Sequence, residues 1–186
     1  MTRPATTGRR LRRLNIALLG ALWLGALLYW GSLPDRVPVH FDARGPDAWT
    51  MKSYAAWFLL PIIALFTTGI MFLSTWAVRR NPRLLNIPRR RQLLELPPEE
   101  RAPILDEVAA LLEAATTAML LIVGIIQLAT YRAALGLSVE GLMMLVLLIA
   151  VAGLPLLIVL LLIRTSARID AVHRAARARG VLEDLG

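Results

Sequence analysis

The chain has 186 residues, of which 57% are apolar and 18% are charged, and its formal net charge is +8. This apolar share exceeds that of an ordinary water-soluble domain, so a purely soluble fold is excluded and the lipid bilayer becomes the expected partner of the apolar surface. The chain contains no cysteine, which excludes disulfides, thiolate nucleophiles and cysteine metal sites. We expect a single membrane domain over residues 1–186.

Four apolar runs predict four transmembrane helices, because about 20 helical residues cross the hydrocarbon core and satisfy their own backbone there. The runs cover approximately residues 14–33, 55–78, 111–131 and 142–163. The predicted fold class is therefore all-α, an integral membrane bundle of four transmembrane helices with an ordered extracytoplasmic loop.

The ends of the first two runs carry further signals. The first run follows an arginine-rich tail, as in a signal peptide, but its exit offers no small-x-small cleavage site, so we interpret it as a retained signal anchor. Trp57 and Trp76 flank the second run. Because tryptophan favours the headgroup level, these two side chains are expected to mark the two membrane interfaces.

Basic residues alternate between the connecting segments. Counted in chain order, the N-terminal tail, the loop 34–53, the loop 79–103, the third connection and the tail 164–186 contain five, three, seven, one and five. The positive-inside rule then predicts a cell-membrane protein with both termini cytoplasmic. Topology and attraction to anionic lipid account for the basic charge, so no nucleic-acid partner is expected.

The loop 34–53 is longer than a minimal connection and is expected to be ordered. Pro38 disfavours helical backbone just before it, so residues 37–42 are expected to be extended. Gly45, which is free to take a positive φ, marks a turn after this stretch.

This loop carries the candidate functional residues, which are Pro34, Pro38, His40, Phe41, Asp42, Gly45, Asp47, Trp49 and Lys52. Their order resembles the signature of a bacterial membrane family, domain of unknown function 1648, which is also found at the N-terminus of SdpI-like immunity proteins. The resemblance implies a membrane fold and location. The immunity role belongs to one longer relative.

Two interpretations remain open for the polar residues of the loop. His40 and Asp42 lie on one face of an extended strand, where they and Asp47 could meet a divalent cation. Alternatively, the two aspartates accept backbone hydrogen bonds in the turn, and His40 packs on a neighbouring aromatic ring. We favour the second interpretation and expect no metal, no cofactor and no catalytic residue.

Two polar residues of the third run are candidate intramembrane sites, because polar groups inside a membrane are often functional. Glu113 and Gln127 could line a transport path. The simpler expectation is that Glu113 pairs with an arginine of the loop 79–103, and that Gln127 bonds a neighbouring helix.

The remaining segments predict two short features. In the loop 79–103, Pro98 followed by two glutamates predicts a short helix start. The tail 164–186 predicts a helical continuation of the fourth span ending near Gly180. This basic helix either rests on anionic lipid, which we favour, or docks a cytoplasmic protein.

The expected function is that of a non-enzymatic multi-pass membrane protein. Its ordered loop would sense, bind or give resistance to a peptide or protein factor at the outer membrane surface. The alternative is a small transporter or export component that uses the polar residues of the third span.

Overall fold

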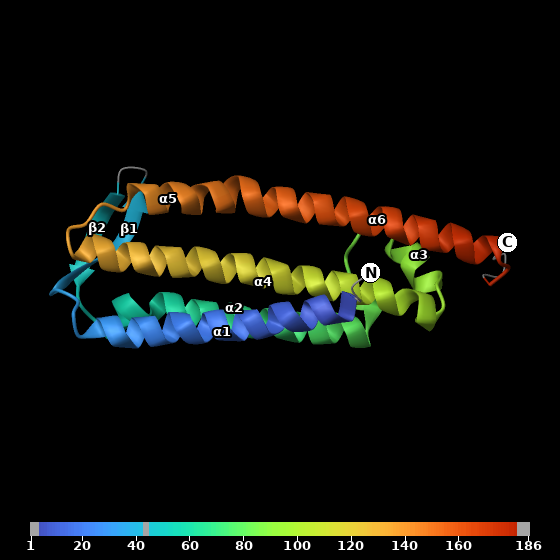
Figure 1. Ribbon diagram of the computed structural model, residues 1–186, viewed down its shortest axis with the longest axis horizontal. Helices are drawn as coiled ribbons and strands as arrows, with labels where there is room; N and C mark the ends of the chain where they lie inside the picture. Colours follow the sequence, from blue (N-terminus) through green and yellow to red (C-terminus); the bar gives the residue numbers. More distant parts are fainter. Residues whose placement is uncertain (1–3, 43–44, 182–186) are drawn as a thin grey trace. The chain divides into compact units, whose positions relative to one another are not determined.

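The structure is a computed structural model that describes residues 4–42 and 45–181, and it is mostly helical, at 79% (Figure 1). Its longest helices are α1 (Pro4–Trp30), α2 (Tyr54–Arg80), α4 (Pro98–Ala134) and α6 (Leu154–Ala178). The shorter helices are the 3-10 helix η1 (Pro82–Leu84), α3 (Arg90–Glu95), α5 (Glu140–Leu147) and the π-helix η2 (Leu148–Gly153). The strands β1 (Arg36–Asp42) and β2 (Gly45–Met51) form a hairpin between α1 and α2.

Within the described residues, four helical segments are long and apolar enough to cross a membrane. They are Thr7–Trp30, Tyr54–Arg80, Pro98–Ala134 and Glu140–Ala178. The predicted membrane bundle is therefore confirmed, and the structure adds a small two-stranded sheet in the predicted outer loop.

The predicted short helix start at Pro98 is the first turn of α4 itself, which continues without interruption to Ala134. Proline is suited to this first position because its missing N–H would have no partner inside the helix. Glu99 and Glu100 occupy the same turn, where negative charge complements the helix dipole.

The chain divides into two compact units, to which α1, α2 and α4 each contribute residues. The hairpin unit comprises Arg13–Ile70 and Ala115–Pro155. The basic unit comprises Met1–Arg12, Met71–Ala114 and Leu156–Gly186, of which residues 4–12, 71–114 and 156–181 are described.

The hairpin unit has apolar contacts among three helices. Leu22 of α1, Ala64 of α2 and Leu120 and Val123 of α4 form a buried cluster. Near it, the Thr117 hydroxyl donates a hydrogen bond of 2.6 Å to Asn15 Oδ1, which joins α4 to α1. Small and polar side chains of this kind hold helices together in lipid, where the hydrophobic effect contributes little.

Trp57 is placed differently from the sequence expectation. Its side chain is buried, with 1% of its surface exposed, and its indole N–H donates a 2.7 Å hydrogen bond to the carbonyl of Ala26. Because its one polar atom already has a partner inside the protein, the ring does not need the membrane interface. Trp76 remains 52% exposed, as an interfacial residue would be.

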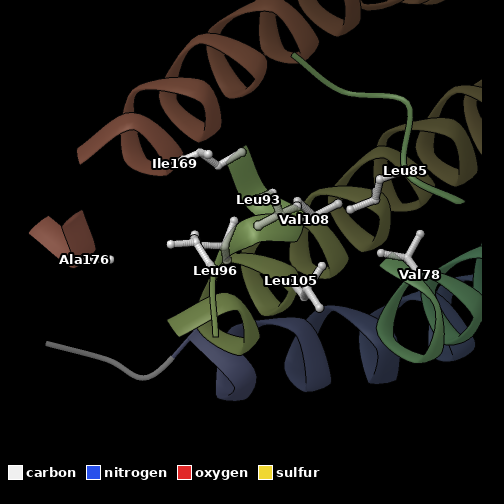
Figure 2. Packing of buried hydrophobic residues seen from close by; sticks show 9 residues of the cluster. Val78, Leu85, Leu93, Leu96, Leu105, Val108, Ile169 and Ala176 are labelled. Carbon is white, nitrogen blue, oxygen red and sulfur yellow. The ribbon is translucent and has the colours of Figure 1, made fainter. Parts of the chain in front are cut away.

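The basic unit is built around α3 and the residue that follows it, which insert Leu93 and Leu96 between longer helices. Leu93 and Leu96 are almost fully buried, and they cluster with residues of α4 and α6, including Val108 and Ile169 (Figure 2). The described part of the tail therefore packs on protein, whereas the sequence favoured a helix resting on lipid. Residues 182–186 of the predicted tail lie outside the described residues.

Ion pairs reinforce the same packing. Arg89 Nε lies 3.2 Å from Asp170 Oδ1, and Arg168 pairs with Glu107. The first pair joins the residue before α3 to α6, and the second joins α6 to α4. Two basic residues of the tail, Arg168 and Arg179, are thus paired with carboxylates of α4.

Candidate functional site

The predicted outer loop folds as an antiparallel hairpin. Arg36 pairs with Met51 at its open end and Asp42 with Gly45 at its closed end. Gly45 has a φ of 130°, which confirms the positive φ expected there and which few side-chain-bearing residues tolerate. The Gly45 N–H also donates to Asp42 Oδ1 at 3.0 Å, and the turn residues 43 and 44 lie outside the described residues.

Lys52 anchors the open end of the hairpin. Its Nζ donates a 2.9 Å hydrogen bond to the carbonyl of Leu33 and lies 4.8 Å from the centre of the Trp30 ring. Its backbone N–H donates to the carbonyl of Asp35 at 2.7 Å. A single residue therefore fixes the exit of β2 to the segment between α1 and β1 through two hydrogen bonds, and to the last residue of α1 through a cation–π contact.

Two apolar side chains of β1 pack against the helices. Val37 is fully buried beside Ala26, Leu33 and Trp57. Phe41 packs on a second cluster formed by the end of α4 and the start of α5. Burying an aliphatic side chain of this size contributes on the order of 2 kcal/mol, so the hairpin has a favourable docking energy in addition to its hydrogen bonds.

The polar residues of the hairpin agree with the second sequence interpretation at Asp42 and differ from both interpretations at His40. His40 Nδ1 lies 2.6 Å from Asp47 Oδ1, across the hairpin. Asp42 accepts the backbone hydrogen bond expected of a turn residue. Shifts in the strand register on either side of His40 interrupt the alternation of faces on which the predicted His40–Asp42 alignment depended.

The His40–Asp47 pair is accessible, with 67% and 43% of the two side chains exposed. Two ligands fall short of the three or four that a protein normally supplies to a bound transition metal. Within residues 4–42 and 45–181, no group of three or more His, Asp or Glu side chains is arranged to hold a metal ion. The pair is suited to hydrogen bonding with a polar ligand.

Apolar side chains of the hairpin are exposed as well. Val39, Trp49 and Met51 have 52%, 39% and 66% of their surface exposed. Trp49 also borders an open hollow of about 470 Å³, whose other lining residues are Pro34, Asp35, Arg36 and Ala134. The hairpin thus combines an apolar patch, a charged hollow and an accessible His–Asp pair.

The two candidate polar residues of the third span lie in different units. Glu113 is buried in the basic unit and lies 3.9 Å from Arg12 Nε, so its arginine comes from α1, whereas the loop 79–103 was expected to supply it. Gln127 is buried in the hairpin unit, where its Nε2 donates to the carbonyl of Trp57 at 3.4 Å. This contact agrees with the expected bond to a neighbouring helix.

A group of stacked rings beside the hairpin was not predicted from the sequence. Tyr29 stacks on Tyr131 with ring centres 4.3 Å apart, and Trp30 stacks on Tyr54 at 4.4 Å. Ser32 Oγ lies 3.2 Å from the Tyr131 hydroxyl. All of these aromatic residues lie at or next to the predicted ends of spans. Their positions in the sequence therefore indicate aromatic side chains at one membrane interface, but they do not indicate which rings stack on each other.

Comparison with known proteins supports the resemblance inferred from the loop. The family model described as "Domain of unknown function (DUF1648)" matches residues 16–65, which contain the whole hairpin. The predicted resemblance is confirmed over these residues.

A curated relative extends the similarity beyond that domain. An uncharacterized protein from Archaeoglobus fulgidus is 35% identical over 88 residues, which make up 44% of this chain and 46% of that protein. The chain therefore spans about half the length of the curated relative it matches. No solved structure matches the chain.

Proposed function

We propose that this chain is a non-enzymatic, multi-pass cell-membrane protein that senses, binds or gives resistance to a peptide or protein factor at the outer membrane surface. The hairpin would be the recognition element. This role resembles that of the SdpI-like immunity proteins in which the same domain occurs. The proposal includes no cofactor and no catalytic residue.

One observation carries the proposal: the hairpin is firmly docked yet leaves recognition groups exposed. Lys52 holds its open end and Val37 holds one face. Trp49 and the His40–Asp47 pair remain accessible. Because an ordered element has little conformational entropy left to lose, the exposed groups can contribute most of their contact energy to binding.

The sheet geometry favours an extended peptide as the factor. In the described chain the sheet has two strands, so each strand has an edge that faces away from its partner. Such edges accept a further strand through backbone hydrogen bonds, while neighbouring hollows select its side chains. The hollow beside Trp49 would provide this selection.

The proposed orientation rests on charge. The segments around the hairpin contain few basic residues, and those around α3 and the tail contain many. The positive-inside rule therefore favours an outer hairpin and cytoplasmic termini. A cytoplasmic protein that binds the exposed arginines of the tail remains part of this proposal.

Deletion of the gene, followed by challenge with a panel of membrane-active peptides, tests the role. We expect the deletion strain to become sensitive to at least one peptide, and the unmodified chain to restore resistance. Trp49→Ala should restore little resistance, whereas Leu59→Ala, which changes an exposed residue of α2, should restore it fully. Equal complementation by both variants, at equal membrane abundance, would exclude the hairpin as the recognition element.

A transporter or export component is the second candidate, and it rests on buried oxygens in the hairpin unit. Among the described residues, Gln127 Oε1 and Thr68 Oγ1 are buried without a hydrogen-bond partner. Buried polar atoms normally have one, and water in a path through the bundle could supply it. If Gln127→Leu abolishes resistance while Trp49→Ala preserves it, the transport candidate replaces the binding role.

A further inference from the structure

A second feature of the chain is a basic pocket in the basic unit, separate from the hairpin. It has a volume of about 340 Å³ and lies between the beginning of α1 and the end of α2. Four arginines and one glutamate line it: Arg9, Arg12, Arg79, Arg80 and Glu113. The ionisable groups of the lining therefore have a formal charge of +3.

Neighbouring groups position two of these arginines. Arg12 lies over the Phe72 ring, 4.3 Å from its centre, and its Nε is 3.9 Å from Glu113 Oε1. The Arg79 guanidinium lies 3.0 Å from Asp106 Oδ1. Because the negative charge of Glu113 is offset by Arg12, it does not cancel the attraction of the pocket for an anion.

The other two arginines keep donor groups for a ligand. Arg80 stacks over the Trp76 ring at 5.0 Å, which leaves the edge of its guanidinium free to donate. The Arg9 side chain makes no ion pair or hydrogen bond with any residue in the described part of the chain. Two arginines with available N–H groups in one pocket match the oxygens of a phosphate group.

We propose that this pocket binds the phosphate of an anionic phospholipid headgroup. Its volume lies at the lower end of the range of small-molecule sites, which suits a headgroup. Guanidinium groups donate paired hydrogen bonds to phosphate oxygens, and basic pockets at the ends of membrane helices bind acidic headgroups in this way.

The surroundings of the pocket favour a lipid over a free phosphate. One candidate span begins at Thr7 and another ends at Arg80, so the pocket lies at the ends of two membrane helices, where headgroups are found. Leu73 and Trp76 lie one turn apart on α2, and they are 62% and 52% exposed. They offer apolar surface for the acyl chains beside the arginines.

Lipid titration of the full-length protein tests the site. The chain is purified, stripped of lipid in a neutral detergent and titrated with phosphatidylglycerol, phosphatidylcholine or inorganic phosphate, while retained ligand is measured by native mass spectrometry. The double variant Arg9→Gln/Arg80→Gln is compared with Arg83→Gln/Arg174→Gln, which removes the same charge from exposed positions outside the pocket. Far-UV circular dichroism verifies that both variants are folded.

We expect phosphatidylglycerol to bind the unmodified protein and phosphatidylcholine to bind it weakly. The pocket variant should lose about tenfold or more in affinity for phosphatidylglycerol, and the control about twofold or less. Equal losses in the two variants would show diffuse surface attraction and overturn the site. Inorganic phosphate that binds as well as the lipid, with the same dependence on Arg9 and Arg80, would overturn the lipid assignment.

Discussion

The hairpin unit and the basic unit are stabilised by different interactions. In the hairpin unit the contacts between elements are mainly stacked rings, buried apolar side chains and neutral hydrogen bonds, such as that from Trp57 to Ala26. In the basic unit an apolar cluster around Leu93 is combined with ion pairs such as Arg79–Asp106. The stability of the hairpin unit should therefore depend on the volume of its buried side chains. The stability of the basic unit should depend on pH and salt as well.

The stability of the two units should respond differently to salt. Ion pairs between exposed groups weaken as salt screens them, whereas aromatic stacking and apolar burial do not depend on charge. The proposed peptide-binding hairpin and the proposed phosphate pocket belong to different units, so variants can separate the two roles.

The largest expected effect is the difference in cysteine labelling between the two sides of the membrane. Because the chain has no cysteine, single cysteines can be introduced and labelled with an impermeant reagent in whole cells. A cysteine at position 44, which is outside the described residues, should be labelled, and one at position 90 should be labelled only after lysis. The opposite pattern would reverse the topology and remove the basis of the proposed outer hairpin.

Loss of ring volume should strongly destabilise the hairpin unit. Trp57→Ala opens a cavity and leaves the carbonyl of Ala26 without its donor, so we expect a loss of about 3–5 kcal/mol in the free energy of unfolding. Denaturant titration in mixed micelles, followed by far-UV circular dichroism, measures it. Trp76→Ala is the control because that ring is half exposed, and a similar loss there would contradict the assignment of the effect to burial.

A smaller effect is expected at the anchor of the hairpin. Lys52→Met keeps much of the side chain but removes the charged hydrogen bond to Leu33, which is worth about 2 kcal/mol. The hairpin should loosen without unfolding the helices. Trypsin should then cut faster after Arg36 than in the unmodified protein, and rapid cutting there before any substitution would show that the hairpin is not ordered in solution.

The smallest effect is a pH dependence of the basic unit. The hydrogen bond from His173 lowers the pKa of Glu95 below its ordinary value of 4.5, a contact with Arg91 lowers it further, and burial opposes both. Since the folded state holds this carboxylate deprotonated, its contribution is complete above about pH 4.5 and is lost as the pH falls through the lowered pKa.

Thermal unfolding between pH 3 and pH 7 measures this contribution. The Tm of the unmodified protein should fall as the solution is acidified below about pH 4.5, and Glu95→Gln should reduce that fall. Glu99→Gln, at an exposed position of α4, is the matched control. An identical acid profile for Glu95→Gln and the unmodified protein would show that the His173 contact does not contribute to stability.

Features that depend on neighbouring residues or on the length of an apolar run could be predicted from the sequence. Four runs of sufficient length predicted the four helices of the bundle, because in lipid a helix must satisfy its own backbone. The positive φ of Gly45 was also predictable, since a turn after an extended stretch needs a residue without a side chain. The family resemblance followed from the order of the loop residues.

Which side chains meet could not be predicted from the sequence and is seen in the folded chain. His40 meets Asp47 across a hairpin whose strand register shifts beside His40. Trp57 is buried in a cluster with Ala26 and Val37, where the carbonyl of Ala26 accepts its indole N–H. The pairing of Glu113 with Arg12 joins residues about a hundred positions apart. Contacts at such separations arise from how helices approach each other, and the pattern of apolar runs determines that helices form without determining their neighbours.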